Sequence, residues 1–191
     1  RLGNALLDSG IRKGQKMAIV PPNCEELMLL YWAAVKIGIV IVPEIPLLQA
    51  SGLTTLLRDS DTVIVFVDAE FAETLNKIKN ELHAIQNKHW ILLGENKTTY
   101  GFKTYSDFIE EASTDEPPDA QLSDDDVYNI MYSSGTTGAL KGIVHTHYVR
   151  ANYCTHFASA CRMTPESIVL YTGAIVFNGA MLDLMPWMFL G

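Results

Sequence analysis

The stretch whose residue types could do chemistry most readily runs from Tyr132 to Gly142 and reads YSSGTTGALKG. Hydroxyl groups can donate hydrogen bonds to phosphate oxygens, and glycines let backbone N–H groups converge on an anion. A lysine adds one positive charge on a flexible stem. All three kinds occur here: Ser133, Ser134, Thr136 and Thr137; Gly135, Gly138 and Gly142; and Lys141. The segment therefore predicts a binding site for a polyphosphate.

Two familiar phosphate-binding loops do not describe this segment. A Walker A loop needs a hydroxyl residue directly after its lysine, whereas Gly142 follows Lys141. The G-x-G-x-x-G pattern of a dinucleotide site does not occur in it either. An ordinary polar hairpin loop without a ligand is the alternative, because most Gly/Ser/Thr tracts are loops of that kind.

The elements that must position this segment are two strand-like runs and a helix. Val127–Tyr132 precedes the segment, and Gly142–His145 ends it. A helix is expected to open near Thr146 or His147. The phosphate-binding groups are therefore expected at a turn between two strands.

The chain before this region alternates strand-like and helix-like segments. Asn23 can cap a helix that Gly38 ends. Apolar or β-branched runs predict strands at Met17–Val20, Ile39–Val42, Thr62–Val67 and His89–Leu93. Helical stripes are expected over 27–35, 53–57, 71–82 and 105–112. This order predicts an α/β fold with a largely parallel sheet and helices on both faces.

The remaining segments set the expected domain organisation. Glu111–Asp126 is acidic, holds two adjacent prolines and is predicted to be a solvated connector, and Ile168–Thr172 is predicted to be a last strand. Both ends of the chain lie inside apolar patterns, which indicates a piece of a longer protein. The expected parts are the tail of a helix at 1–16, an α/β lobe at 17–162 and the start of a second, truncated lobe at 163–191.

Composition limits the classes of partner. With 48% hydrophobic residues and a formal charge of −8, the chain reads as a globular protein that repels nucleic acid. The two long apolar stretches, Ile37–Leu48 and Ala174–Gly191, are interrupted by prolines and acidic or amide residues. They predict buried core, not a transmembrane segment. Three scattered cysteines predict a reduced, cytoplasmic setting, and no metal site is predicted, since His145 and His147 point to opposite faces of an extended chain.

Tyr132–Val144, read YSSGTTGALKGIV, resembles the signature loop of the adenylate-forming (AMP-binding) superfamily. That superfamily includes acyl-CoA synthetases, aryl-CoA ligases, luciferases and peptide-synthetase adenylation domains. Leu140 departs from the pattern, because a proline is usual there. Asn23–Pro43, Asp59–Asp68 and Thr146-His147 are similar to further segments of the family. The resemblance implies that the chain is an incomplete part of the large N-terminal domain of such an enzyme.

The resemblance also implies a function. It predicts ATP-dependent activation of a small-molecule carboxylic acid to acyl-AMP, followed by thioester formation with coenzyme A. ATP is expected to bind together with Mg²⁺, and a role in fatty acid metabolism is expected. The nucleotide-binding residues it implies are Ser133, Ser134, Gly135, Thr136, Thr137, Gly138 and Lys141. Phe177 and Gly179 are implied as substrate-binding, although Tyr171–Gly179 matches the family's acyl-pocket element poorly: Ala174 replaces a proline and Phe177 a histidine.

Several parts of that family's active site are not found in the sequence. The Tyr-Gly-x-Thr-Glu motif, the ribose-binding aspartate and the catalytic lysine of the C-terminal domain all lie beyond the matched segment. The chain is therefore expected to hold no catalytic residue and to be inactive alone. A peptide-synthetase adenylation domain or luciferase-like enzyme is one alternative, and a non-catalytic nucleotide-binding module is another.

Overall fold

The structure, a computed structural model, describes residues 1–20, 23–45, 48–94, 97–134 and 140–191. The chain divides into two compact units, Arg1–Gln121 and Leu122–Gly191. Each has its own set of helices and strands. The three-part division expected from the sequence, with boundaries at residues 16 and 162, stays a prediction.

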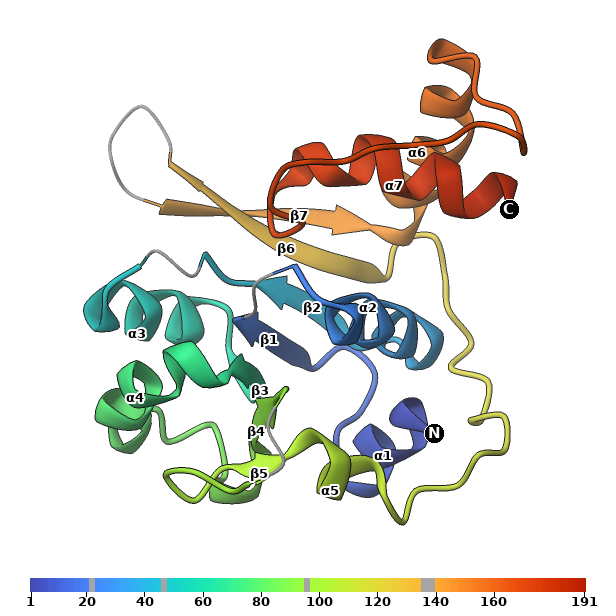
Figure 1. Cartoon of the computed structure of the whole chain (residues 1–191). Helices are drawn as coiled ribbons and strands as arrows, with labels where there is room; N and C mark the ends of the chain where they lie inside the picture. Colours follow the sequence, from blue (N-terminus) through green and yellow to red (C-terminus); the bar gives the residue numbers. More distant parts are fainter. Residues whose placement is uncertain (21–22, 46–47, 95–96, 135–139) are drawn as a thin grey trace. The chain divides into compact units, whose positions relative to one another are not determined.

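The first unit is a parallel sheet with helices on both faces. Its strands pair in the order β5-β4-β3-β1-β2, each parallel to its neighbour. Helices α1, α2 and α5 pack together on one face, and α3 and α4 on the other (Figure 1). The elements are α1 Leu2–Asp8, β1 Lys16–Val20, α2 Glu25–Ile37, β2 Val40–Pro43, α3 Ala50–Asp59, β3 Thr62–Asp68, α4 Ala69–Ile78, the short 3₁₀ helices Lys79–Glu81 and Asn87–His89, β4 Trp90–Leu93, β5 Lys103–Thr104 and α5 Tyr105–Ile109. The α/β prediction is confirmed.

Burial explains why these runs become strands. Residues 17–20 of β1 and all of β4 are buried, as expected for strands covered by helices on both faces. Gly38 ends α2 in the left-handed conformation, at a φ of 73°, which glycine adopts without strain. The predicted cap was wrong by one residue. Cys24, not Asn23, holds the N-cap position of α2, and it makes no side-chain capping bond.

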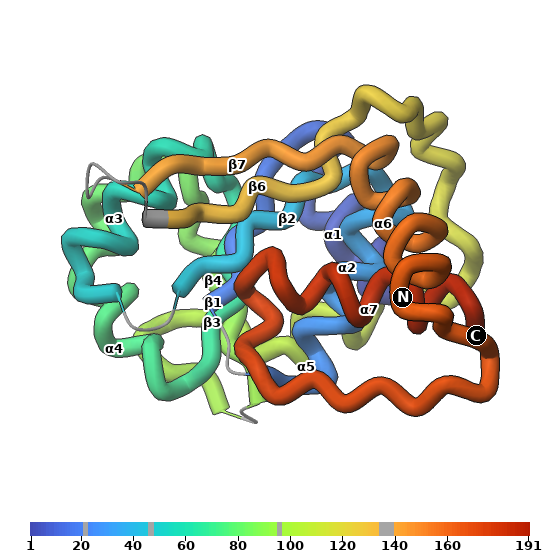
Figure 2. The backbone as a smooth tube through the Cα atoms, turned by 90° about the horizontal axis from the view of Figure 1, so that it is seen from above, coloured from blue at the N-terminus to red at the C-terminus, as the bar shows by residue number. Residues whose placement is uncertain are grey.

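The second unit is a two-stranded antiparallel ribbon with two helices. Strands β6 Val127–Ser134 and β7 Leu140–Thr146 run side by side, and the helices are α6 His147–Ala160 and α7 Asn178–Leu190 (Figure 2). Helix α6 begins at His147, as the sequence predicts, and Thr146 caps it, because its Oγ1 accepts a hydrogen bond from the N–H of Val149.

Two expectations for the end of the chain were wrong. Residues 168–172 form no strand, and the side chains of Ile168 and Leu170 are 98% and 85% exposed. A run of apolar residues forms a stable strand only where a neighbouring strand pairs with its backbone N–H and C=O groups. The stretch predicted as core instead forms α7, in which Pro186 is buried but Trp187 and Phe189 are exposed.

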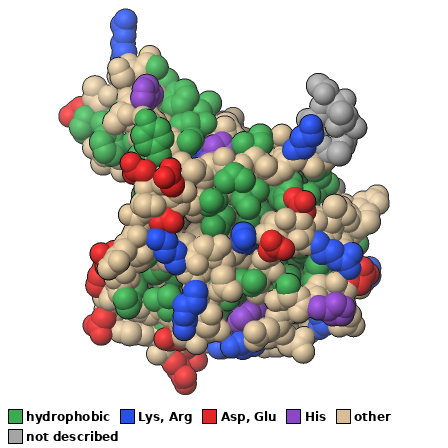
Figure 3. All heavy atoms as spheres, turned by 180° about the vertical axis from the view of Figure 1, so that it is seen from behind, with side chains coloured by type: hydrophobic (Ala, Val, Ile, Leu, Met, Phe, Trp, Pro, Cys, Tyr) green, Lys and Arg blue, Asp and Glu red, His purple; other side chains and the backbone are tan. Residues whose placement is uncertain are grey.

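Helix lengths and surface charge among the described residues can be compared with what a membrane or a nucleic acid would require. Among them, no helix has both the length and the apolar content that crossing a bilayer requires. Basic and acidic side chains are interspersed over the face that Figure 3 shows. All three cysteines are free thiols.

Candidate functional site

The β6–β7 ribbon places two of the predicted phosphate-binding residues opposite each other. Ser133 of β6 pairs directly with Lys141 of β7, and the next pair is Ser134 with Leu140. Directly opposed residues of an antiparallel pair have Cβ atoms about 5 Å apart on the same face. The side chains of Ser133 and Lys141 are both exposed. The register therefore places a hydroxyl residue and a lysine opposite each other at the described end of the ribbon.

The segment between the two strands lies outside the described residues. It contains four of the predicted nucleotide-binding residues, Gly135, Thr136, Thr137 and Gly138, and the side chain of Ser134 is outside the description as well. The two paired strands fix where this segment leaves and re-enters the ribbon. The polyphosphate assignment of its residues stays a prediction.

Gly142 has a different role from the one its sequence suggested. It was expected to supply a positive φ to an anion-binding turn, but it lies within β7 opposite Tyr132, and its φ is not in the left-handed region. A Cβ at this position would come within 2.9 Å of Cγ2 of Ile130 and 3.3 Å of the Tyr132 ring. Gly142 is therefore a close-packing residue of the ribbon.

Behind the ribbon lies a buried polar cluster around Arg150 of α6, whose side chain is 1% exposed. Its Nε donates to Oδ1 of Asn129 on β6, and its Nη1 donates to Oδ1 of Asn178 on α7, each at 2.9 Å. The ring of Tyr153 lies 5.0 Å from the guanidinium carbon, close enough for a cation–π contact. One arginine thus connects a strand and two helices.

Two titratable groups of the same unit have pKa values displaced by burial. Burial, together with the positive charge of Arg150, lowers the pKa of His145 to about 4. Burial raises the pKa of Tyr128 to about 12, and its hydroxyl donates to the sulfur of Met185 on α7 at 3.8 Å. Both groups are uncharged near neutral pH, so they act here as structural and hydrogen-bonding groups.

The residues predicted to contact the acid lie at the start of α7. Phe177 is the N-cap residue and is 45% exposed, and Gly179 is in the first turn with open space where a Cβ would stand. Asn178, held by Arg150, lies between them in sequence. Sequence reasoning missed Arg150 and Asn178, because a single arginine in a polar helix resembles a solvent-exposed residue.

Glu44 is a second residue that the sequence did not single out. It follows β2, and its side chain is fully buried. Neither carboxylate oxygen has a hydrogen-bond partner among the described residues. Burial raises its pKa to about 8. Open α/β sheets commonly bind ligands at the carboxyl ends of their parallel strands, and Glu44 follows the carboxyl end of β2.

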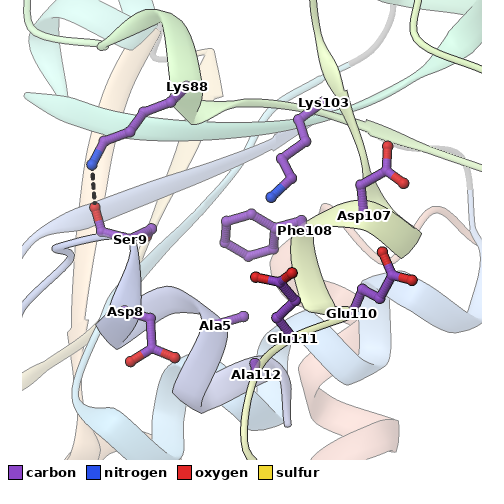
Figure 4. A pocket seen from close by; sticks show the side chains of 10 residues that line it. All are labelled: Ala5, Asp8, Ser9, Lys88, Lys103, Asp107, Phe108, Glu110, Glu111 and Ala112. Atoms are coloured by element: carbon purple, nitrogen blue, oxygen red, sulfur yellow. Dashed lines mark hydrogen bonds between the residues drawn. The ribbon is translucent and has the colours of Figure 1, made fainter.

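A surface cavity of about 610 Å³ lies at the other edge of the same sheet (Figure 4). Lys88, ahead of β4, donates to the carbonyl of Ser9, and Lys103, at the start of β5, lies 5.9 Å from the Phe108 ring centroid. Both lysines adjoin the amino ends of parallel strands, opposite to the usual ligand edge. None of the predicted site residues lines this cavity.

Comparisons with known proteins give a consistent picture. The sequence matches the family described as AMP-binding enzyme over residues 1–191. It is 33% identical over 148 residues to a long-chain-fatty-acid–CoA ligase, FadD13, of Mycobacterium tuberculosis, covering 77% of this chain and 27% of that protein. It is 30% identical over 175 residues to a crotonobetaine/carnitine–CoA ligase of Citrobacter koseri, covering 89% and 33%.

The fold is shared with solved structures of the same kind. The crystal structure of the anthranilate CoA ligase AuaEII in complex with anthranoyl-AMP superimposes with a TM-score of 0.91 at 25% identity, over 100% of this chain and 36% of that one. The N-terminal domain of FACL13 from Mycobacterium tuberculosis superimposes with a TM-score of 0.78 at 26% identity. The chain thus spans about a third of the length of the relatives it matches, and it matches their N-terminal part.

Proposed function

The chain belongs to the AMP-binding enzyme family, and we propose that it forms the triphosphate-binding part of an AMP-forming acid–thiol ligase. In the proposed reaction a carboxylate oxygen attacks the α-phosphorus of ATP, which releases pyrophosphate and gives an acyl-AMP. The thiol of coenzyme A then attacks the acyl carbon and displaces AMP. The named relatives, all acid–CoA ligases, support coenzyme A as the acceptor in preference to a carrier protein.

The observation that carries the proposal is the register of the ribbon. Ser133 and Lys141 face each other where the family's signature segment begins and ends. A hydroxyl donor and a lysine at that point can hold the β- and γ-phosphates and offset the charge that develops on departing pyrophosphate. In the proposal the hydroxyls of Ser134, Thr136 and Thr137 and the backbone of Gly135 and Gly138 complete the phosphate contacts.

The acid would be recognised at the start of α7, by Phe177 and Gly179. The relatives named above differ in their acids: a long-chain fatty acid, crotonobetaine or carnitine, and anthranilate. We therefore propose a carboxylic acid as the substrate class. In the part of the chain that the structure describes, no three metal-ligating side chains lie together. We accordingly assign Mg²⁺ no ligand from these residues.

The direct test uses the complete natural polypeptide that carries these residues. Acid-dependent pyrophosphate release from MgATP is measured with fatty, aromatic and betaine acids. Lys141→Ala is expected to lower kcat/KM for ATP roughly ten- to hundredfold, because a charge-assisted phosphate contact is lost. Lys77→Ala, which removes an exposed lysine of α4, is the matched control and is expected to leave activity unchanged. Acid-dependent turnover that is insensitive to Lys141→Ala would contradict the phosphate assignment.

The 191-residue chain alone tests how the activity is divided. It contains no Tyr-Gly-x-Thr-Glu sequence, which the family uses for adenine and magnesium. We expect it to release no pyrophosphate in an acid-dependent reaction under conditions where the complete polypeptide does. Turnover by the 191-residue chain would show that the chemistry does not need the rest of the relatives' length.

A further inference from the structure

Arg150 occupies a position that normally disfavours a charge. Its side chain is 1% exposed, and two of its hydrogen bonds go to the amide oxygens of Asn129 and Asn178. Moving a guanidinium out of water costs several kcal/mol before its contacts are counted. Hydrogen bonds from a charged donor are among the stronger ones, so these two hydrogen bonds restrict the orientation of both amide side chains. A buried arginine with this geometry acts as a rigid connector.

The side chain of Asn178 is fixed at both ends by this cluster. Its Oδ1 accepts from Nη1 of Arg150 at 2.9 Å, and its Nδ2 donates to the hydroxyl of Tyr153 at 3.3 Å. The ring of Tyr153 in turn contacts the guanidinium. Because both ends of the amide are bonded, neither its side-chain rotamer nor the backbone that carries it can shift without breaking a contact.

What Asn178 fixes is the entry to α7. Asn178 is the first residue of that helix, directly after the N-cap residue Phe177. Phe177 is 45% exposed, so its ring is accessible to a substrate. The direction in which the ring points therefore depends on the backbone that Asn178 anchors. At the other end of the connection, Arg150 holds Asn129 of β6, the strand that leads into the signature segment.

We propose that Arg150 is a positioning residue that, through Asn178, holds the start of α7 and orients Phe177 for recognition of the carboxylic acid. This inference rests on the proposed function. Arg150 touches neither the acid nor the nucleotide in this assignment. Loss of the Arg150 side chain is expected to weaken binding of the acid and to reduce the selectivity between different acids. The contacts to the phosphates are expected to remain.

The test compares KM values in the complete natural polypeptide. Asn178→Leu removes the oxygen that Arg150 bonds, whereas Asn178→Asp keeps an acceptor oxygen at nearly the same place. Asn178→Leu is expected to raise KM for the acid about tenfold and to flatten the preference between long and short acids. Asn178→Asp is expected to stay close to the wild type. KM for ATP is expected to remain unchanged in both.

Arg150→Met is expected to reproduce the effect of Asn178→Leu. Its matched control is Arg162→Met, which makes the same change at an exposed arginine just after α6. If Arg150→Met unfolds the protein, as judged by circular dichroism, the Asn178 pair decides the question, because Asn178 is only half-buried.

Three results would overturn the inference. One is an equal loss in Asn178→Leu and Asn178→Asp. Another is a fall in kcat with an unchanged acid KM, which indicates a structural effect only. The third is an equal rise of the acid and ATP KM values. A wild-type polypeptide with no acid-dependent pyrophosphate release would instead refute the proposed function, and this inference with it.

Discussion

At the scale of single residues, burial without hydrogen bonds controls the ionisation of Glu44. The pKa of this carboxyl is about 8 in the folded chain, against an ordinary value of 4.5. A raised folded pKa means that the folded state holds the proton more tightly than the unfolded state. The stability that this proton supplies is complete below about pH 4.5 and is lost as the pH rises through about 8.

Glu44→Gln is therefore expected to stabilise the chain increasingly as the pH rises. The substitution keeps the shape but removes the ionisation, so the difference in unfolding free energy should grow by at most about 1.4 kcal/mol per pH unit between pH 4.5 and 8. Urea unfolding at pH 5, 6.5 and 8 measures this difference. Glu111→Gln, at an exposed glutamate, is the control and should give a flat profile. A flat profile for Glu44→Gln would show that the carboxyl is ionised in the fold.

The pKa of His145 is shifted in the opposite direction to that of Glu44, and so is the pH dependence that it gives to stability. Its pKa of about 4 in the fold lies below the ordinary value of 6.5, because burial and Arg150 disfavour its charged form. The unfolded chain takes up this proton first, so the fold loses stability as the pH falls from about 6.5 towards 4. His145→Gln should lessen that acid loss, and thermal unfolding at pH 4.5 and 7 would measure it. An unchanged acid loss would place its origin elsewhere.

At the scale of elements, the β6–β7 ribbon depends on a close approach at Gly142. A methyl group there would lie 2.9 Å from Cγ2 of Ile130, so the Ile130 side chain or the backbone that carries it must shift. Gly142→Ala is expected to cost about 1–3 kcal/mol of stability. Gly179→Ala makes the same chemical change where no atom lies within 4 Å, and it should cost nothing. Denaturant midpoints of the two variants provide the comparison, and equal midpoints would contradict the packing role.

The elements also show which parts of the fold the sequence could predict. Ile39–Val42 was recognisable as a strand because a β-branched run after a helix-ending glycine has few other outcomes. Gly142 was misread because a glycine needed for close packing and one needed for a positive φ look alike in a sequence. Ile168–Thr172 was misread because a continuous apolar run carries no information on whether a partner strand exists.

Some residues of the candidate site can likewise be recognised in the sequence, and others cannot. Ser133 and Lys141 stood out in the sequence because hydroxyls, glycines and a lysine are concentrated in one short segment, and their phosphate-binding role stays a prediction. The Arg150–Asn178 contact joins residues 28 positions apart. Nothing local in the sequence marks such a contact. Glu44 could not be found either, because its pKa depends on burial that only the assembled fold creates.

At the scale of the whole molecule, the connector between the two units is the expected site of first cleavage. Residues 110–126 contain no helix or strand, and 122–125 are exposed. Backbone carbonyls of Ser113 and Asp115 are tied to Asn4, so the earlier part of the connector is held to the first unit. The carbonyls of Asp124 and Asp126 accept hydrogen bonds from the N–H groups of Tyr148 and His147, so the later part is held to the second unit. Brief digestion with an Asp-specific protease is therefore expected to cut first at the exposed Asp119 and to give two pieces, identified by mass spectrometry. A first cut at Asp68, the last residue of β3, would contradict the division into units.

Pro186 gives α7 a property that its length alone would not suggest. A proline has no N–H to donate, so the carbonyl four residues earlier, at Leu182, loses its bond within the helix. The segment before it is secured at Asn178 by Arg150 and at Met185 by Tyr128, while Trp187 and Phe189 extend beyond it into solvent. A force that acts on those two aromatic rings is therefore expected to bend α7 at Pro186. The first turn of the helix, next to Phe177, is expected to keep its orientation.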